Sequence, residues 1–193
     1  MIQLPHPKGK GDVIMRFKTK DMIQCAVFAA ILCVFSIIAI PAGAIPFTLG
    51  VLGILLCAII LGCKKSVISV LVFILLGAVG LPVFSGFKGG FQVLAGPTGG
   101  YITGYIVTAL LVGFCADHIP GNTIKSTILL FLSCAAGVIL CYLFGTIQYM
   151  FTADKTLLQG LALCVFPFIP FDLLKCVLAC AIGIPVRKRL ASS

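Results

Sequence analysis

Long apolar stretches, separated by short polar or glycine- and proline-rich segments, dominate the hydropathy pattern of this chain. A helix needs about 20 apolar residues to cross the hydrocarbon core of a bilayer. Six windows approach that length: Met22–Ile40, Ile45–Gly62, Ser66–Phe84, Thr98–Ala116, Ser126–Gly145 and Phe168–Val186. The second window is the shortest, and a tilted or partly re-entrant segment is an alternative there. The pattern predicts an all-α integral membrane protein, a bundle of six transmembrane helices that forms a single domain over residues 21–190.

Two segments fit this pattern less simply. Leu157–Val165 is apolar but too short to span, so we expect a membrane-embedded loop or an interfacial helix there. The basic start, the apolar first window and Ala42-Gly43-Ala44 also resemble a secretory signal with its small-residue cleavage site. However, the apolar core of about 19 residues exceeds the usual length, and five more windows follow. We therefore interpret the first window as a retained helix.

Composition agrees with a bilayer as the solvent. Of the 193 residues, 61% are hydrophobic and only 10% are charged, whereas about a quarter of the residues in soluble domains are charged. The ten cysteines lie in or beside apolar runs, and no Cys-x-x-Cys pair occurs. We interpret the cysteines as small hydrophobic residues and expect no metal site and no cofactor.

Basic residues are distributed unevenly between the two sides of the predicted bundle. One side, which includes the basic segment 1–20, carries eleven Lys and Arg, whereas the other carries only Lys88 and Lys155. Because cytoplasmic loops are enriched in Lys and Arg, we expect both termini in the cytoplasm. The net charge of +9 then reflects membrane topology, and we expect no nucleic acid as a partner. The outer connections are 42–45, 85–97 and 146–167.

The middle outer connection has an unusual composition. Leu81–Tyr101 carries six glycines interleaved with phenylalanine and leucine. Glycine allows close approach of the backbone to a ligand, and non-helical backbone at membrane depth is tolerated only in protein or along a cavity. We expect this loop to fold into the membrane and to present amides to a small molecule; the alternative is a flexible, solvated turn. No P-loop motif occurs, so the energy for any pumping must come from another protein.

Asp172 and Lys175 are two charges inside the last window, where each costs about 2.5–3.5 kcal/mol on insertion scales. Their i, i+3 spacing places both on one helix face, and Pro167 and Pro170 mark the start of that helix. An intramembrane charge is a functional-site hypothesis by default. We expect the pair to contact a polar ligand from the wall of a cavity. The alternative is a mutually neutralising pair that only stabilises the bundle.

Weaker signals come from three other places. Prolines flank the first outer connection, and Phe47 and Thr48 follow it as candidate ligand contacts. Ala26 and Ala30 form a small-xxx-small face in the first window, which favours close helix contact within the bundle or with a partner. We interpret the polar residues around the turn after the fourth window as ordinary solvated loop residues: Asp117, His118 and Lys125.

Together, three motifs resemble the BioY family, the biotin-specific S components of energy-coupling-factor (ECF) transporters. The motifs are Pro46-Phe47-Thr48-Leu49, the glycine-rich loop ending in Gly96-Pro97-Thr98-Gly99-Gly100-Tyr101, and Pro167-Phe168-Ile169-Pro170 followed by Asp172-Leu173-Leu174-Lys175. Their order and spacing match the family over most of the chain. The sequence departs from the family pattern at Gly50, where Gln is frequent, at Lys88, where a small or amide residue is frequent, and at Phe171, where Gly is usual.

The resemblance implies a six-helix protein of the prokaryotic cell membrane that captures biotin with high affinity from outside. It implies no enzymatic activity, because transport would depend on a transmembrane coupling subunit and two ABC-type ATPases. Ala26 and Ala30 match the helix face on which the family docks the coupling subunit. Asp172 is hypothesised to accept the ureido N–H groups, with Lys175 paired to it and touching a ligand oxygen. The implied substrate-binding residues are Phe47, Thr48, Lys88, Gly89, Gly90, Gln92, Thr98, Gly99, Gly100, Tyr101, Asp172 and Lys175.

Three alternative classes stay open on the sequence alone. The first is an S component or small-solute carrier for another vitamin, which ligand selectivity would distinguish. The second is a small intramembrane enzyme, although Ser85 has no histidine partner on the outer side. The third is a structural membrane subunit without a ligand.

Overall fold

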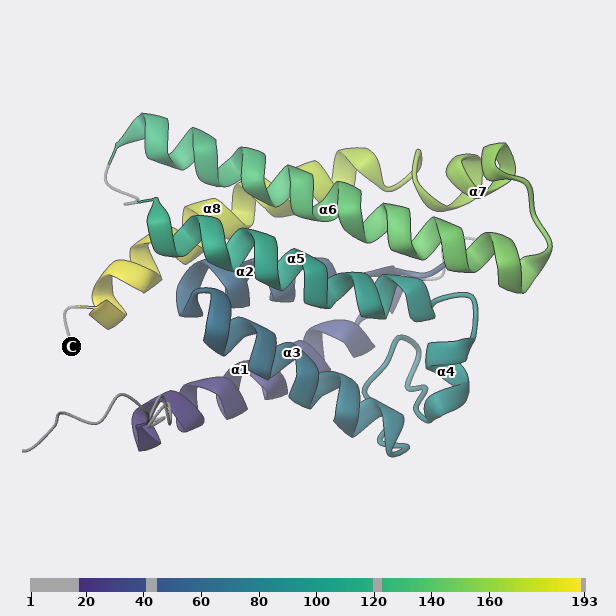
Figure 1. Ribbon diagram of the computed structural model, residues 1–193, viewed down its shortest axis with the longest axis horizontal. Coiled ribbons are helices and arrows are strands. Elements are labelled where there is room, and N and C mark those ends of the chain that lie inside the picture. The colour runs from purple at the N-terminus through teal and green to yellow at the C-terminus, as the bar shows by residue number, and fades with distance from the viewer. Residues whose placement is uncertain (1–17, 41–44, 120–122, 192–193) are drawn as a thin grey trace, which may run out of the picture.

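The computed structural model describes residues 18–40, 45–119 and 123–191, and in these ranges the chain is mainly helical (Figure 1). The helices are α1 (Thr19–Ile37), α2 (Gly50–Leu61), α3 (Cys63–Ala78), α4 (Phe91–Ala95), α5 (Gly99–His118), α6 (Ile124–Ala153), α7 (Leu157–Cys164) and α8 (Ile169–Ala191). A two-stranded antiparallel ribbon, β1 (Ala39–Ile40) with β2 (Phe47–Thr48), departs from a purely α fold. Most of the basic segment 1–20 and the proposed cleavage motif at 42–44 lie outside the described residues.

Four of the described helices are long and apolar enough to cross a membrane: α1, α5, α6 and α8. The chain is therefore a multi-pass membrane protein. The second and third predicted windows correspond to shorter helices, α2 with 12 residues and α3 with 16. These two windows are longer than the helices because a hydropathy window counts apolar residues whatever their backbone conformation. Here, residues 45–49 and 79–84 are apolar but lie outside the helices.

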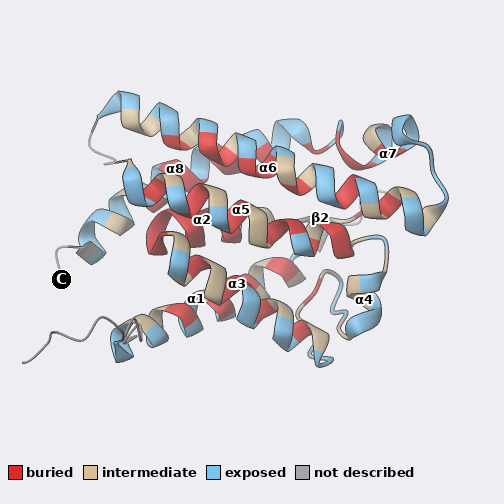
Figure 2. Ribbon diagram, viewed as in Figure 1, coloured by how far each residue is buried: buried red, intermediate tan, exposed pale blue. Residues whose placement is uncertain are grey.

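The short helix α2 lies among the other helices, and its residues from Gly53 to Leu61 are all buried (Figure 2). A helix that is apolar on every side is expected in the interior of a bundle. Gly62 separates α2 from α3 and has a positive φ of 77°. A Cβ at this position would collide with the Asp117 carboxylate, so the break between the two helices requires glycine.

Helices α5 and α6 form the most extensive helix pair and run antiparallel (Figure 1). The Thr108 hydroxyl of α5 donates across this pair to the Gly137 carbonyl of α6 at 2.8 Å. Small and hydroxyl residues are typical of membrane helix contacts, because they allow close approach and add interhelical hydrogen bonds. On the other side of α2, helix α8 completes the core with Cys176, Ala179 and Cys180.

Helix α6 is longer than its window predicted. It continues from Gly145 to Ala153 and ends at Asp154, which adopts a left-handed conformation with φ 48° and ψ 47°. The predicted outer connection 146–167 therefore contains the last two turns of α6 and all of α7. For Leu157–Val165, the helical alternative is confirmed, with Thr156 and Gln159 forming a capping box at its start.

The two ends of the bundle differ in structure (Figure 1). The β-ribbon, α4 and α7 lie at one end, which we call the loop end and define as residues 45–49, 79–98 and 154–168. The opposite end, which we call the Asp117 end, contains the start of α1, the α2–α3 junction, the end of α5, the start of α6 and the end of α8. Of the ion pairs between described residues, Asp172–Lys175 lies toward the loop end, and Asp117–Arg187 and Asp21–Lys65 lie at the Asp117 end.

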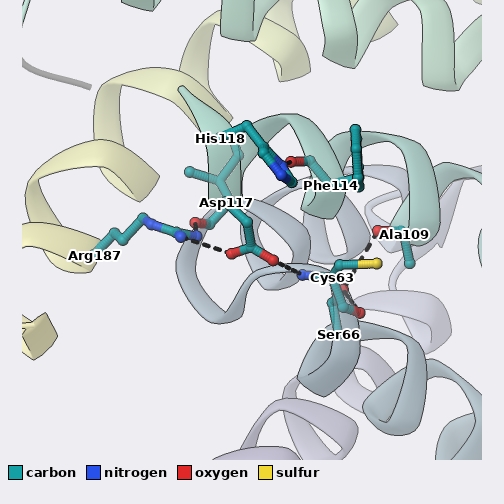
Figure 3. Close-up of polar contacts among 8 residues, drawn as sticks. Cys63, Ser66, Ala109, Phe114, Asp117, His118 and Arg187 are labelled. Atoms are coloured by element: carbon teal, nitrogen blue, oxygen red, sulfur yellow. Dashed lines mark hydrogen bonds and ion pairs between the residues drawn. The ribbon is translucent and has the colours of Figure 1, made fainter. Parts of the chain in front are cut away.

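Asp117 and Arg187 together connect four helices at the Asp117 end of the bundle (Figure 3). Its carboxylate accepts the Cys63 backbone N–H at 2.8 Å and pairs with Arg187 Nη2 at 2.8 Å. Arg187 Nη1 also donates to the Ile59 carbonyl at 2.7 Å. The prediction that Asp117 is an ordinary loop residue is therefore wrong, since it caps α3 and ties α5 to α8. His118 and Lys125 are exposed as predicted, although they lie in helices.

Candidate ligand site

A cavity of about 390 Å³ opens at the loop end, between the β-ribbon, the segment 84–98 and helices α5, α6 and α8. Its volume falls within the range of about 300–1,000 Å³ that is typical of small-molecule sites. Isoleucine, valine, proline, phenylalanine and tyrosine side chains form most of the wall, and a few polar groups are placed among them. This is the composition expected for an amphiphilic ligand.

Asp172 and Lys175 form the charged part of the cavity wall. Because they lie one turn apart near the start of α8, Lys175 Nζ reaches Asp172 Oδ1 at 2.7 Å. The two residues are 3% and 5% exposed. The ammonium also donates to the Thr48 carbonyl at 2.8 Å and lies 3.9 Å from the centre of the Phe47 ring. These three favourable contacts therefore offset the cost of burying the Lys175 charge.

Tyr142 holds the second oxygen of the same carboxylate. Its hydroxyl, on α6, donates a short hydrogen bond to Asp172 Oδ2, while Oδ1 binds Lys175. An ionised carboxylate offers about four lone-pair positions. Asp172 is thus fixed on both oxygens and still has acceptor capacity for N–H groups of a ligand in the cavity.

The β-ribbon positions the first-loop residues. Pairing of Ala39 with Thr48 and of Ile40 with Phe47 brings β2 back over the end of α1. The Phe47 ring stacks with Phe168, with ring centres 6.1 Å apart. Aromatic pairs at such distances add to the stabilisation from burial. The ring on which the Lys175 ammonium rests is therefore itself held in place.

The cavity wall contains seven of the twelve predicted binding residues: Thr48, Lys88, Gln92, Thr98, Tyr101, Asp172 and Lys175. Phe47 reaches the site through its ring contact with Lys175. The four predicted glycines are not among the residues of the wall: Gly89, Gly90, Gly99 and Gly100.

Gly99 and Gly100 allow the glycine-rich loop to pack closely. A Cβ at Gly99 would collide with the Leu94 carbonyl, and one at Gly100 would collide with a carbonyl of α6. Gln148, also on α6, donates to the Leu94 carbonyl at 2.7 Å and to the Gly96 carbonyl at 2.9 Å. These contacts hold the loop against α6 and so position Thr98 and the residues before it.

Several cavity residues were not predicted from the sequence. Tyr142 gives the clearest signal in retrospect, because a tyrosine in an apolar helix has a polar tip that needs a partner. Tyr105 and Cys141 face the cavity from α5 and α6, and Cys164 faces it from the end of α7. Burial raises the pKa of the Cys164 thiol, so this residue stays protonated and adds no charge to the site.

A second cavity of about 380 Å³ lies beside the first, between α6, α7 and α8. Its wall is apolar except for a few groups that include Tyr142, Asp172 and Thr146. Tyr142 and Asp172 also line the first cavity. The hydrogen bond between them therefore lies in the wall that separates the ligand cavity from this apolar space.

The three departures from the family pattern occupy different positions around the site. Gly50 begins α2, and a Cβ there would lie 3.0 Å from the Tyr105 hydroxyl. Lys88 is in the cavity wall and is exposed. Phe171 packs edge-on against Phe47, with ring centres 5.1 Å apart, and is half exposed. Only Lys88 brings a new charge to the cavity.

Comparison with known proteins gives one consistent result. The sequence profile of the BioY family matches residues 9–192. A biotin transporter BioY from Thermotoga maritima is 38% identical over 170 residues, which cover 88% of this chain and 96% of that protein. A biotin transporter BioY from Rhizobium etli is 31% identical over 172 residues, covering 86% and 91% of the two chains.

A solved structure supports the same relationship. The crystal structure of the S component for biotin from an ECF-type ABC transporter superposes with a TM-score of 0.78 and 31% identity. The alignment covers 88% of this chain and 91% of the solved one. The sequence profile, the relatives and the fold all agree, and the motifs of the chain surround one cavity. This chain therefore belongs to the BioY family.

Proposed function

We propose that this chain is the substrate-binding S component of an ECF transporter and that its ligand is biotin. The observation that carries the proposal is the buried Asp172–Lys175 pair on the wall of a mainly apolar cavity. The relatives named as biotin transporters and the structural neighbour named as a biotin S component support the same ligand.

The chemistry of biotin matches the distribution of groups in the cavity. Its ureido group would donate N–H groups to Asp172, whose carboxylate is held by Tyr142 and Lys175. The ureido carbonyl of biotin would accept a hydrogen bond, and the Lys175 ammonium is the donor beside Asp172. The bicyclic ring and the aliphatic tail would pack against the aromatic and aliphatic wall. The carboxylate at the end of the tail would approach Lys88.

The distribution of charge supports the proposed orientation, with both termini in the cytoplasm and six membrane crossings in one domain. The loop end carries Lys88 and Lys155. The Asp117 end carries the other basic residues of the described connections and termini: Lys18, Lys20, Lys64, Lys65, Lys125, Arg187, Lys188 and Arg189. From the positive-inside rule we propose that the Asp117 end faces the cytoplasm and that the cavity opens toward the outside.

Transport would require partner proteins, and α1 offers a surface for one. Cys25 and Ala29 face the bundle and are buried, whereas Ala26 and Ala30 are exposed on a neighbouring face of the helix. We propose that this small-residue face docks the transmembrane coupling subunit, which in turn binds two ABC-type ATPases. The chain would then act in the cell membrane of a prokaryote as a transport subunit and not as an enzyme.

The direct test is calorimetric or radioligand titration of purified, detergent-solubilised protein with biotin, alongside desthiobiotin, thiamine and riboflavin. Saturable binding of biotin and no binding of thiamine or riboflavin is expected. Wild-type protein that is folded but binds none of these ligands would overturn the proposal. Selective binding of thiamine or riboflavin would assign the chain to another vitamin. As a matched control, Asp117→Ala changes the other carboxylate cluster and should bind biotin like the wild type.

A further inference from the structure

A small hairpin, Phe84–Lys88, forms part of the cavity wall. Phe84 N–H donates to the Lys88 carbonyl at 2.9 Å, and Lys88 N–H donates back to the Phe84 carbonyl at 3.3 Å. The three residues between them turn sharply, with φ of 71° at Gly86 and 59° at Phe87. A left-handed conformation at a phenylalanine is strained, and such strain is concentrated at functional sites.

The hairpin is anchored at its base. The Phe84 side chain is 1% exposed and meets the Phe73 ring edge to face, with centres 5.6 Å apart. It also fills the space beside Gly77, where a Cβ would collide with the Phe84 ring. By contrast, the Phe87 ring at the tip is 71% exposed. The anchored base fixes the direction of the side chain that follows Phe84.

That side chain is Ser85, which lines the cavity. Its hydroxyl is buried and has no hydrogen-bond partner in the parts of the chain that the structure describes. A buried hydroxyl without a partner is unfavourable and calls for an explanation. Thr146 has the other unpartnered buried hydroxyl of the described residues, but it lines the second cavity and not the first.

Lys88 lines the same cavity from the other strand of the hairpin. None of the salt bridges between described residues involves Lys88. Among the described residues, the only carboxylate in the cavity wall is Asp172, whose oxygens already bind Lys175 and Tyr142. The hairpin thus presents a hydroxyl donor and a cation, and the ligand group that suits both is an anion with acceptor oxygens.

We propose that Phe84–Lys88 is the anion-recognition element of the site, and that Ser85 Oγ–H donates a hydrogen bond to the carboxylate of the ligand beside Lys88. This assignment rests on the proposed function, in which the ligand carries a carboxylate. Ser85 is then a specificity-determining residue: it favours ligands with a carboxylate over neutral analogues of the same shape, because only the former satisfy its hydroxyl.

The test combines two ligands with three variants of the full-length protein. The ligands are biotin and an analogue in which a methyl group replaces the carboxylate. Ser85→Ala should weaken biotin binding about tenfold or more and leave binding of the methyl analogue unchanged. Ser85→Thr keeps the hydroxyl and should recover most of the affinity for biotin. Thr146→Val removes the other unpartnered hydroxyl and should bind both ligands like the wild type.

The outcomes separate this assignment from the proposed function. If Ser85→Ala lost affinity equally for both ligands, the hydroxyl would be needed for the structure of the site and not for the carboxylate. That result would overturn the assignment. Biotin affinity that Ser85→Ala leaves at the wild-type value would also overturn it, while the proposed function stands. Wild-type protein that does not bind biotin would overturn both.

Discussion

Asp172–Lys175 and Asp117–Arg187 are ion pairs of nearly equal length, 2.7 and 2.8 Å, at opposite ends of the bundle. The side chains of the first pair are 4% and 6% exposed, whereas those of the second are 39% and 31% exposed. The first pair borders an open cavity, and the second bonds to backbone groups of packed helices. Distance alone therefore says little about what an ion pair does.

The two ion pairs differ in their burial and in the acceptor positions that their carboxylates leave open. Burial of an ion pair carries a large desolvation penalty, so a buried pair contributes little to the stability of the fold. A role in ligand binding explains such a pair better. Asp172 is held on two sides and faces the cavity on a third. In Asp117, the oxygens are used to cap α3 and to hold α8. We expect variants of the first pair to change binding and variants of the second to change stability.

The largest expected effect is in Asp172→Ala. Removal of one member leaves the Lys175 ammonium buried without its carboxylate, a change that typically costs 3–5 kcal/mol, and it removes the proposed acceptor for the ureido group. Biotin binding should fall by at least about 100-fold, as measured by titration of protein whose helical content is unchanged by circular dichroism. Near-normal affinity in folded Asp172→Ala would remove this pair from the site.

Tyr142→Phe is expected to have an intermediate effect. It removes the hydroxyl that orients Asp172 Oδ2 but keeps the ring and the ion pair. Loss of one hydrogen bond to a charged group should weaken biotin binding about tenfold. The same titration checks this, with Tyr149→Phe as the matched control, because Tyr149 lies on α6 outside both cavities. If Tyr149→Phe weakened binding equally, the orienting role of Tyr142 would be excluded.

The smallest expected effect on binding is in Arg187→Met. It keeps much of the aliphatic stem but removes the contacts to Asp117 and to the Ile59 carbonyl. Because the pair is about a third exposed, its loss should lower stability by only about 1 kcal/mol, measured as a small decrease in thermal unfolding temperature in detergent. Biotin affinity should equal that of the wild type. A large loss of affinity would show that the two ends of the bundle are coupled.

Features that depend on residues close together in the chain could be predicted from the sequence. The spacing of Asp172 and Lys175, after two prolines, predicted one face of a helix, and the structure pairs them directly. Phe47 and Thr48 were identified from a short motif, and both contact Lys175.

Features that depend on distant parts of the chain were missed. The partner of Tyr142 lies 30 residues away, and the two partners of Asp117 lie 54 and 70 residues away. Nothing in the residues around Asp117 distinguishes it from a solvated turn residue. The length of α2 was not predicted for a similar reason, because the ribbon that shortens this helix forms only by pairing with the end of α1.

The shortness of α2 determines how deeply a ligand sits in the bilayer. Twelve helical residues extend about 18 Å, whereas the hydrocarbon core is about 30 Å thick. The cavity occupies the missing length, since Thr48 and Val51 line it at the start of α2. In the proposed orientation, a molecule bound there would already have crossed about two fifths of the hydrocarbon core by diffusion, about 12 of the 30 Å. The driven step of import would then have to move it across the remaining three fifths.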